Sequence, residues 1–199
     1  MIANTKFAIK AQEAGVDAIV AEGFEAGGHN GRDETTTLCL IPMVAKELSI
    51  PLIAAGGIGT GRGMLAAMNL GADAVQVGSR FVTSTESSAH ENFKQYIIAS
   101  EEGDTMLTLK ELTPVRLLKN EFYTKLQSAY QDGADKEKLT EILGRGRAKK
   151  GMFEGDLIEG ELEIGQIAGL IEKIMPAGEI VQEMMSEFHH VLNEQKNYL

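Results

Sequence analysis

A glycine-rich segment with one histidine is the first candidate for chemistry. Residues 22–31 read Glu-Gly-Phe-Glu-Ala-Gly-Gly-His-Asn-Gly and directly follow a short apolar run. Because a histidine side chain titrates near neutral pH, His29 could act as a general base or as a hydrogen-bond donor. The glycines before it would let the backbone approach a flat ligand closely. An exposed loop histidine is the alternative, and His90, His189 and His190 lie in helix-like stretches typical of solvated surface.

Two further glycine-rich turns could bind an anion. Residues 54–59 read Ala-Ala-Gly-Gly-Ile-Gly, and residues 76–81 read Gln-Val-Gly-Ser-Arg-Phe. Backbone N–H groups at a strand-to-helix turn attract a phosphate, and the positive end of the following helix reinforces them. The first turn departs from the dinucleotide-binding fingerprint, because Arg62 stands where a third glycine is required. A tight turn without a ligand therefore remains an alternative for it.

The elements around these turns follow an alternating pattern. Helices are expected over 6–14, 40–48 and 62–70, and strands over 16–22, 51–55 and 74–77. This order predicts a parallel sheet with crossover helices, and the repeat of the helix–glycine–strand junction supports it. Since ligands bind at the carboxyl ends of parallel strands, the three candidate loops should meet at one end of the sheet.

The strand pattern stops after Arg80. A capping box at 88–91 is expected to open a helix that runs to Ile98, and further helices are expected over 135–143 and 178–192. Residues 144–160 form a glycine-rich linker of mixed charge. The repeated junctions suit a barrel or an open doubly wound sheet, so we predict two units, which are an α/β unit of one of these kinds over 1–95 and a mainly helical extension over 96–199 that packs on it.

The composition narrows the class of protein. A chain of 199 residues with 43% hydrophobic residues is globular, and its net charge of −10 argues against binding nucleic acid or an anionic membrane surface. The one cysteine, Cys39, lies in an apolar run and is expected to be buried. No secretory signal and no apolar run of membrane-spanning length is present, so a cytoplasmic location is expected.

Together, the three glycine-rich segments resemble the nitronate monooxygenase (2-nitropropane dioxygenase) family. The closely related flavin-dependent enoyl-acyl-carrier-protein reductases share them, and the similarity continues through 86–90 and 165–171. The resemblance implies the C-terminal part of a (β/α)8 TIM barrel that binds FMN, with strands six to eight at 16–22, 51–55 and 74–77. Such barrels build their phosphate site from the loops after strands seven and eight and span about 250 residues, so the N-terminal strands are expected upstream.

The resemblance also implies roles for individual residues. His29 would be the catalytic histidine near the flavin, and no metal ligands are expected. Ser79 stands where family members often have threonine, and the hydroxyl is retained. The residues predicted to bind the cofactor are Glu22, Ala26, Gly27, Gly28, Ala55, Gly56, Gly57, Gln76, Gly78 and Ser79.

Three functions are carried forward. The first is oxidation of alkyl nitronates with O2, in which His29 orients the substrate or removes a proton. The second is an enoyl-acyl-carrier-protein reductase that uses NAD(P)H and FMN, and the shared segments do not separate it from the first. The third, from a different class, is a truncated and catalytically inactive fragment. Its unpaired strand edges would favour aggregation or a homo-oligomer.

Overall fold

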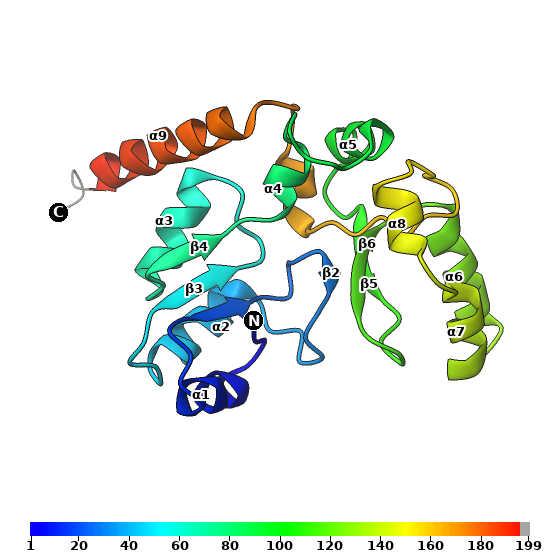
Figure 1. Ribbon diagram of the computed structural model, residues 1–199, viewed down its shortest axis with the longest axis horizontal. Helices are drawn as coiled ribbons and strands as arrows, with labels where there is room; N and C mark the ends of the chain where they lie inside the picture. The colour runs from blue at the N-terminus through cyan, green and yellow to red at the C-terminus, as the bar shows by residue number, and fades with distance from the viewer. Residues whose placement is uncertain (196–199) are drawn as a thin grey trace.

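The computed structural model describes residues 1–195, which form two small sheets surrounded by helices (Figure 1). A parallel sheet has the strand order β1-β3-β4, and an antiparallel sheet has the order β2-β6-β5. The elements are α1 (Thr5–Glu13), β1 (Ile19–Glu22), β2 (Gly28–His29), α2 (Thr37–Ala45), β3 (Leu52–Ala55), α3 (Gly61–Asn69), β4 (Ala74–Gln76), α4 (Ser79–Val82), α5 (Glu91–Ile98), β5 (Thr105–Thr108), β6 (Val115–Leu118), α6 (Glu121–Gln131), α7 (Lys136–Leu143), α8 (Arg147–Met152), the 3-10 helix η1 (Gln166–Leu170) and α9 (Ala177–Gln195).

The parallel sheet confirms the predicted βαβαβ order. Strand β1 pairs with β3, and β3 pairs with β4, in parallel throughout. The helix-facing side of the sheet buries Ile19, Leu52 and Ala54 in one apolar core. On the opposite side, Val20 and Ile53 are only half-buried. One face of the sheet is therefore fully buried against the helices, and apolar side chains on the other face remain partly accessible.

Helix α2 corrects the expectation for Cys39, which is exposed. The helix begins at Thr37 and buries Leu40, Ile41 and Val44 against the sheet. This spacing selects one face of the helix, so Cys39 lies on the face turned toward solvent. An apolar run in the sequence did not distinguish the two faces, because its residues are apolar on both sides.

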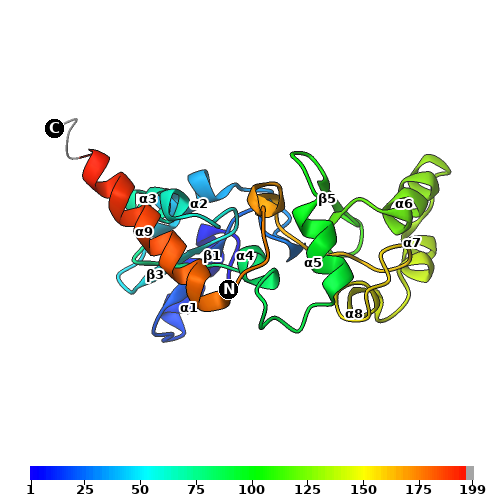
Figure 2. The ribbon, with the colours of Figure 1, turned by 90° about the horizontal axis from the view of Figure 1, so that it is seen from above.

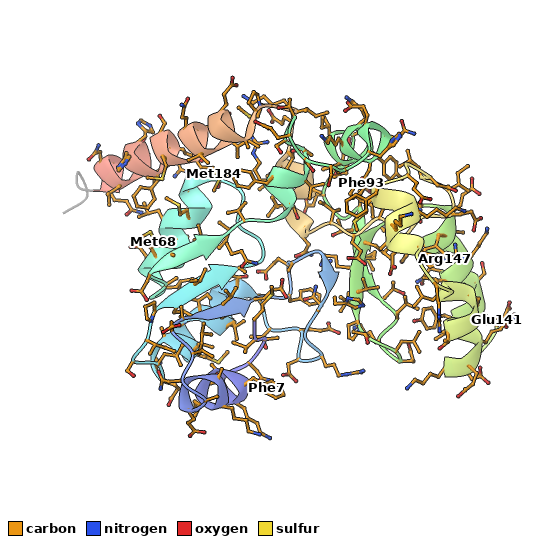
Figure 3. The ribbon with its side chains drawn as sticks, viewed as in Figure 1. Phe7, Met68, Phe93, Glu141, Arg147 and Met184 are labelled. Carbon is orange, nitrogen blue, oxygen red and sulfur yellow. The ribbon has the colours of Figure 1, made fainter. Side chains whose placement is uncertain are left out.

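The longest helix, α9, packs across α3 (Figure 2). It buries Ile180, Met184 and Val191, and Met184 lies on the side that faces α3 (Figure 3). The crossing point requires a glycine, since a Cβ on Gly61 would lie 2.1 Å from the Met184 carbonyl oxygen. Within residues 1–195, no helix is both long and apolar enough to cross a membrane.

The second sheet was missed by the sequence patterns. Strand β6 is central, pairing with β5 along its length and with β2 at Val115 and Arg116. All four residues of β6 are buried, Arg116 included, so the strand shows no alternation of polar and apolar positions. Its partner β2 has two residues and comes from the glycine-rich loop after β1. Residues of the two predicted units therefore share one sheet.

Two local predictions in the second half were also wrong. Helix α5 begins at Glu91 with His90 as its N-cap, whose Nδ1 accepts a hydrogen bond from the Asn92 N–H, and the expected Ser88 cap is not used. The stretch 144–160 contains α8 and is therefore more than a linker.

Candidate functional site

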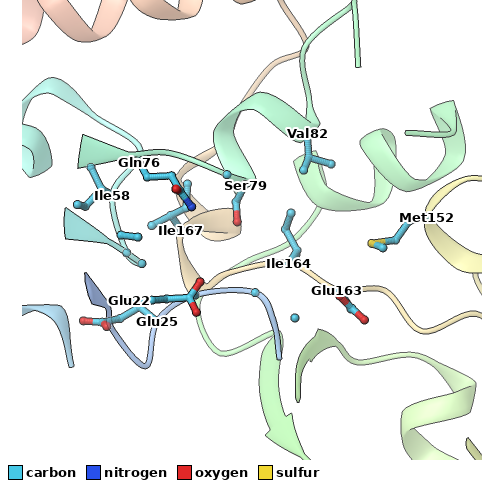
Figure 4. A pocket seen from close by; sticks show the side chains of 17 residues that line it. Glu22, Glu25, Ile58, Gln76, Ser79, Val82, Met152, Glu163, Ile164 and Ile167 are labelled. Atoms are coloured by element: carbon cyan, nitrogen blue, oxygen red, sulfur yellow. The ribbon is translucent and has the colours of Figure 1, made fainter. Parts of the chain in front are cut away.

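A cleft lies where the carboxyl ends of the parallel strands face the second sheet (Figure 4). Its volume is about 190 Å³. The structure brings together all ten residues predicted to bind the cofactor, and their binding role stays a prediction. The cleft is lined by Glu22, Glu25, Ala26, Gly27, Gly28, Ala55, Gly56, Gly57, Ile58, Gln76, Gly78, Ser79, Val82, Met152, Glu163, Ile164 and Ile167.

The loop after β1 passes very close to a segment more than 130 residues later in the chain. A Cβ on Gly27 would lie 2.3 Å from the carbonyl carbon of Ile164 and 2.5 Å from the nitrogen of Gly165. Gln166 donates its N–H to the Glu25 carbonyl oxygen at 2.9 Å. Glycine at position 27 therefore serves this backbone crossing, in addition to any ligand contact.

The loop after β3 is held in a conformation that favours glycine. Gly56 and Gly57 have φ values of +89° and +69°. A Cβ on Gly56 would lie 2.7 Å from the Gly23 carbonyl oxygen, so the loops after β1 and β3 touch there. The Thr37 hydroxyl lies 2.8 Å from the Gly56 carbonyl oxygen and 3.0 Å from the Glu25 carboxylate, which also accepts the Thr37 N–H. The two loops are thus tied to the start of α2.

The loop after β4 is the open side of the cleft. A Cβ on Gly78 would meet no atom within 4 Å. The Ser79 hydroxyl accepts the Gly165 N–H at 2.9 Å, so this side chain already has a structural contact. Among the described residues, the N–H groups of Gly57, Gly78 and Ser79 have no hydrogen-bond acceptor. They are free to bind an anion in the cleft.

The start of α3 does not join this set, contrary to the expectation from the sequence. The Gly61 N–H donates to the Glu187 carboxylate of α9 at 2.7 Å, and the Gly63 N–H donates to the Thr60 hydroxyl at 3.0 Å. The positive end of the helix therefore already has acidic and hydroxyl partners. An anion in the cleft must rely on the loop N–H groups instead.

His29 lies at the rim of the cleft. It is the second residue of β2, opposite Val115 of β6, and its side chain is exposed. The preceding residue, Gly28, lines the cleft with a φ of +75°. Of the predicted residues, only the histidine stands outside the cleft lining.

Three carboxyl groups in or beside the cleft have raised pKa values. Burial raises the pKa of Glu22 at the end of β1. Burial also raises the pKa of Glu163, while the nearby His29 lowers it in part. Burial and the charge of Glu163 raise the pKa of Glu161 to about 7. Titratable groups with such shifts are concentrated at functional sites, although structural pairs show them too.

Sequence reasoning did not single out the residues that line the cleft from the second half of the chain. Glu163 and Ile164 precede η1, Ile167 lies within it, and Met152 ends α8. A signal was present for Ile167, because the segment 165–171 belongs to the similarity noted above. No local pattern indicated that it lies beside residues 25–28.

A buried arginine connects the second sheet to the cleft loops. Arg116 of β6 is 1% exposed, and its Nε and Nη2 donate to the Phe24 carbonyl oxygen at 3.2 and 3.1 Å. Its guanidinium carbon also lies 4.4 Å from the centre of the Phe24 ring. Burial lowers the pKa of Arg116, and Glu25 and Glu34 oppose that shift. The side chain thus positions the loop that carries the Gly27–His29 segment.

Residues 1–187 match the family model for nitronate monooxygenase. The chain belongs to the nitronate monooxygenase family. A protein of Staphylococcus saprophyticus described as "probable nitronate monooxygenase" is 34% identical over 197 residues, which cover 94% of this chain and 55% of that protein. One of Staphylococcus aureus is 48% identical over 109 residues, or 51% of this chain and 31% of that protein.

Two solved structures are similar over nearly the whole chain. FabK from Thermotoga maritima is 39% identical with a TM-score of 0.93, covering 100% of this chain and 62% of that one. Nitroalkane oxidase from Streptomyces ansochromogenes is 29% identical with a TM-score of 0.79, covering 98% of this chain and 58% of that one. The chain therefore spans between about half and three-fifths of the length of the relatives that match it throughout.

Proposed function

We propose that this chain forms the FMN-binding, C-terminal part of a (β/α)8-barrel nitronate monooxygenase that oxidises alkyl nitronates with O2. In this proposal β1, β3 and β4 are strands six, seven and eight. One observation carries it: in a member of this family, the loops after three adjacent parallel strands converge on one cleft with three free N–H groups. The half-buried far side of the sheet suits the interior of such a barrel.

The cleft fits the chemistry of FMN. Its phosphate carries close to two negative charges, and a chain with a net charge of −10 offers no general attraction. The N–H groups of Gly57, Gly78 and Ser79 would supply local donors, each charge-assisted bond contributing about 1.5–3 kcal/mol. The cleft volume of about 190 Å³ is below the roughly 300–1,000 Å³ of complete ligand pockets, so these residues would form one wall of the site.

When bound, FMN supplies the redox chemistry. The chain's own residues would position the reactants. Gly27, Gly28 and Ala55 would allow close approach of the flat ring, and Gln76 and Glu22 would lie near it as polar groups. His29 at the rim would orient the nitronate or take a proton from a nitroalkane.

The cofactor site is tested by flavin fluorescence titration of the chain completed with the upstream strands of a relative. We expect Gly78→Val to weaken FMN binding more than tenfold, because the side chain would fill the open space above the loop. Ser79→Ala should weaken it less, since the backbone N–H remains. Equal affinities for wild type and Gly78→Val would show that the phosphate binds elsewhere. The 199-residue chain alone should retain FMN weakly or not at all.

The role of His29 has its own test. In the completed protein, His29→Ala should leave FMN bound and reduce turnover by roughly 100-fold or more, as is usual when a general acid–base group is lost. Steady-state kinetics with propionate 3-nitronate and O2 measures this. Normal turnover of the variant would return His29 to the class of exposed loop histidines.

An NAD(P)H- and FMN-dependent enoyl-acyl-carrier-protein reductase is the second candidate. The likeness to FabK, with 39% identity and a TM-score of 0.93, favours it. The same completed protein should be assayed with crotonyl thioester and NADPH beside the nitronate assay. Whichever substrate gives the larger kcat/KM decides between the two reactions.

A catalytically inactive fragment is the candidate from another class. For the active protein, we further propose that residues 1–95 form the partial barrel and that residues 96–199 form an extension packed on it. We also propose a cytoplasmic location. Failure of the completed protein to bind FMN or to turn over either substrate would favour the inactive fragment. Size-exclusion chromatography of the 199-residue chain would then show whether it forms a homo-oligomer.

A further inference from the structure

A buried arginine directly follows the loop after β4 that borders the cleft. Arg80 lies in α4, next to Ser79, whose side chain lines the cleft (Figure 4). The arginine itself is 6% exposed and lies outside the cleft lining. Its carbonyl oxygen accepts the Thr83 hydroxyl at 3.0 Å. A guanidinium this buried needs an anionic partner, because an uncompensated buried charge is strongly destabilising.

The C-terminal helix supplies that partner. Nη2 of Arg80 donates to the Glu183 carboxylate of α9 at 3.0 Å and to the Met175 sulfur at 3.3 Å. Nη1 is also buried, and it has no hydrogen-bond partner among residues 1–195. Within the same residues, Glu183 is the one carboxylate paired with Arg80. The arginine therefore depends on α9 for its compensating charge.

Glu183 is held firmly enough to serve as an anchor. One oxygen of its carboxylate pairs with Arg80, and the other pairs with Lys173 at 2.9 Å. The hydrogen bond from Lys173 and the charge of Arg80 keep the pKa of Glu183 below its ordinary value. The carboxylate is therefore ionised at neutral pH and bound on both sides.

The same C-terminal segment packs against α4 and the residues that follow it. Val77 and Phe81, on either side of the loop after β4, contact an apolar cluster formed by Met175, Ile180 and Met184. The Thr85 N–H donates to the Met175 carbonyl oxygen at 3.2 Å. A helix of four residues is too short to be stable by itself. Helix α4 therefore takes its position from α9 and the residues just before it.

We infer that Glu183 is a positioning residue for the anion site and that, acting through Arg80, it holds the Gly78–Ser79 backbone where its N–H groups meet the phosphate of FMN. Arg80 is bonded directly to Ser79, so a displacement of the arginine displaces those N–H groups. Hydrogen bonds weaken steeply away from their preferred geometry, so a small displacement lowers the affinity for phosphate. The inference rests on the proposed FMN site and adds to it a residue of α9 that lies outside the cleft lining.

The test compares FMN with riboflavin, which has the same ring system and no phosphate, by flavin fluorescence titration of the completed protein. In Glu183→Gln, the affinity for FMN should fall about tenfold, as when one charge-assisted hydrogen bond is lost, while that for riboflavin stays within about twofold. A general loss of packing would weaken both flavins alike. Glu179→Gln, which replaces an exposed glutamate of the same helix, is the matched control and should change neither affinity.

A double-mutant cycle tests whether Glu183 acts through Arg80. Arg80→Met places an apolar side chain beside the apolar cluster and should itself lower the affinity for FMN, because the contact with Glu183 is lost. In that background, Glu183→Gln should cause no further loss, since both changes remove the same contact. Additive effects of the two substitutions would overturn the inference.

A third measurement uses the 199-residue chain without flavin. In ¹H–¹⁵N NMR spectra, Glu183→Gln should shift the amide signals of Gly78 and Ser79. The signal of Gly57 should stay in place, because its loop is tied to the start of α2. Unshifted signals of Gly78 and Ser79 would overturn the inference without any flavin being bound.

The titrations also separate failure of this inference from failure of the proposed site. If Glu183→Gln keeps the wild-type preference for FMN over riboflavin, the inference is wrong and the proposed phosphate site stands. If the wild-type protein binds the two flavins equally, the proposed phosphate site is wrong, and the inference falls with it.

Discussion

The two sheets of this molecule are assembled in different ways. In the parallel sheet, each strand follows its own crossover helix, so most contacts join neighbours in the chain. In the antiparallel sheet, β6 collects β5 on one edge and the two-residue β2 on the other. The first sheet supplies the loops of the cleft, and the second holds one of those loops in place. Each loop of the cleft can be recognised from a short sequence motif. The shape of the cleft nevertheless depends on strands that lie far from these motifs in the sequence.

The glycines of the cleft differ in the same way. Gly27 lies where the loop from the first sheet crosses the segment 163–166, and its hydrogen faces backbone atoms. Gly78 faces open space. Glycines that look alike in the sequence therefore serve either packing or access, and substitutions can separate the two roles.

The largest effect is expected for Gly27→Ala. The added Cβ would lie 2.3 Å from the Ile164 carbonyl carbon and 2.5 Å from the Gly165 nitrogen, and backbone atoms cannot rotate away. We expect a loss of about 3 kcal/mol in the free energy of unfolding. Urea denaturation measures it. Gly178→Ala, where nothing lies within 4 Å, is the control and should change stability by less than about 1 kcal/mol.

Arg116→Met should come next, because it removes the link between β6 and the loop after β1. The variant loses two hydrogen bonds to the Phe24 carbonyl oxygen and the contact with the Phe24 ring. A destabilisation of about 2–3 kcal/mol is expected in urea denaturation. Arg145→Met is the control at an exposed site. If both variants were equally stable, the second sheet would not be holding the loop.

Glu161→Gln should stabilise the protein in a pH-dependent way. The folded-state pKa of about 7 exceeds the ordinary 4.5, so the folded chain binds more protons between these values and wild-type stability falls as pH rises. Glutamine removes that loss. In denaturation experiments at pH 8.5, the free energy of unfolding of Glu161→Gln should exceed that of wild type by about 2 kcal/mol, which is less than the full pKa shift would give. At pH 4 the two proteins should be equally stable. A gain independent of pH would contradict burial of the charge as its cause.

The smallest effect is expected for Gly78→Ala. Its backbone φ is negative and its Cβ position is empty, so the free energy of unfolding should change by less than about 0.5 kcal/mol. Comparison of this variant with Gly27→Ala tests whether Gly27 is required for backbone packing while Gly78 only leaves open space in the cleft. A large destabilisation would mean that the loop after β4 is packed as tightly as the loop after β1.

The parallel half could be predicted because its signals are local. Glycine at the end of a helix, followed at once by a short apolar strand, indicates a βα unit wherever it lies in the chain. The second sheet carries no such signal. Strand β6 buries Arg116 among apolar residues, and a buried arginine is identified only by its partners, Phe24 and Thr105. The error at Cys39 has the same origin, since the neighbours of α2 decide which face is buried.

The sequence by itself determined the parallel sheet, the three glycine-rich loops and the family to which the chain belongs. Those properties depend on residues only a few positions apart in the chain. The types of these residues decide whether the backbone forms a strand or a turn, and a turn leaves N–H groups free. Only the tertiary structure decided that Glu163 lies against Gly28, that Arg116 holds the Phe24 loop and that Glu187 covers the start of α3. Each of these contacts joins residues more than 90 positions apart, and burial of the apolar clusters, not any local pattern, brings them together.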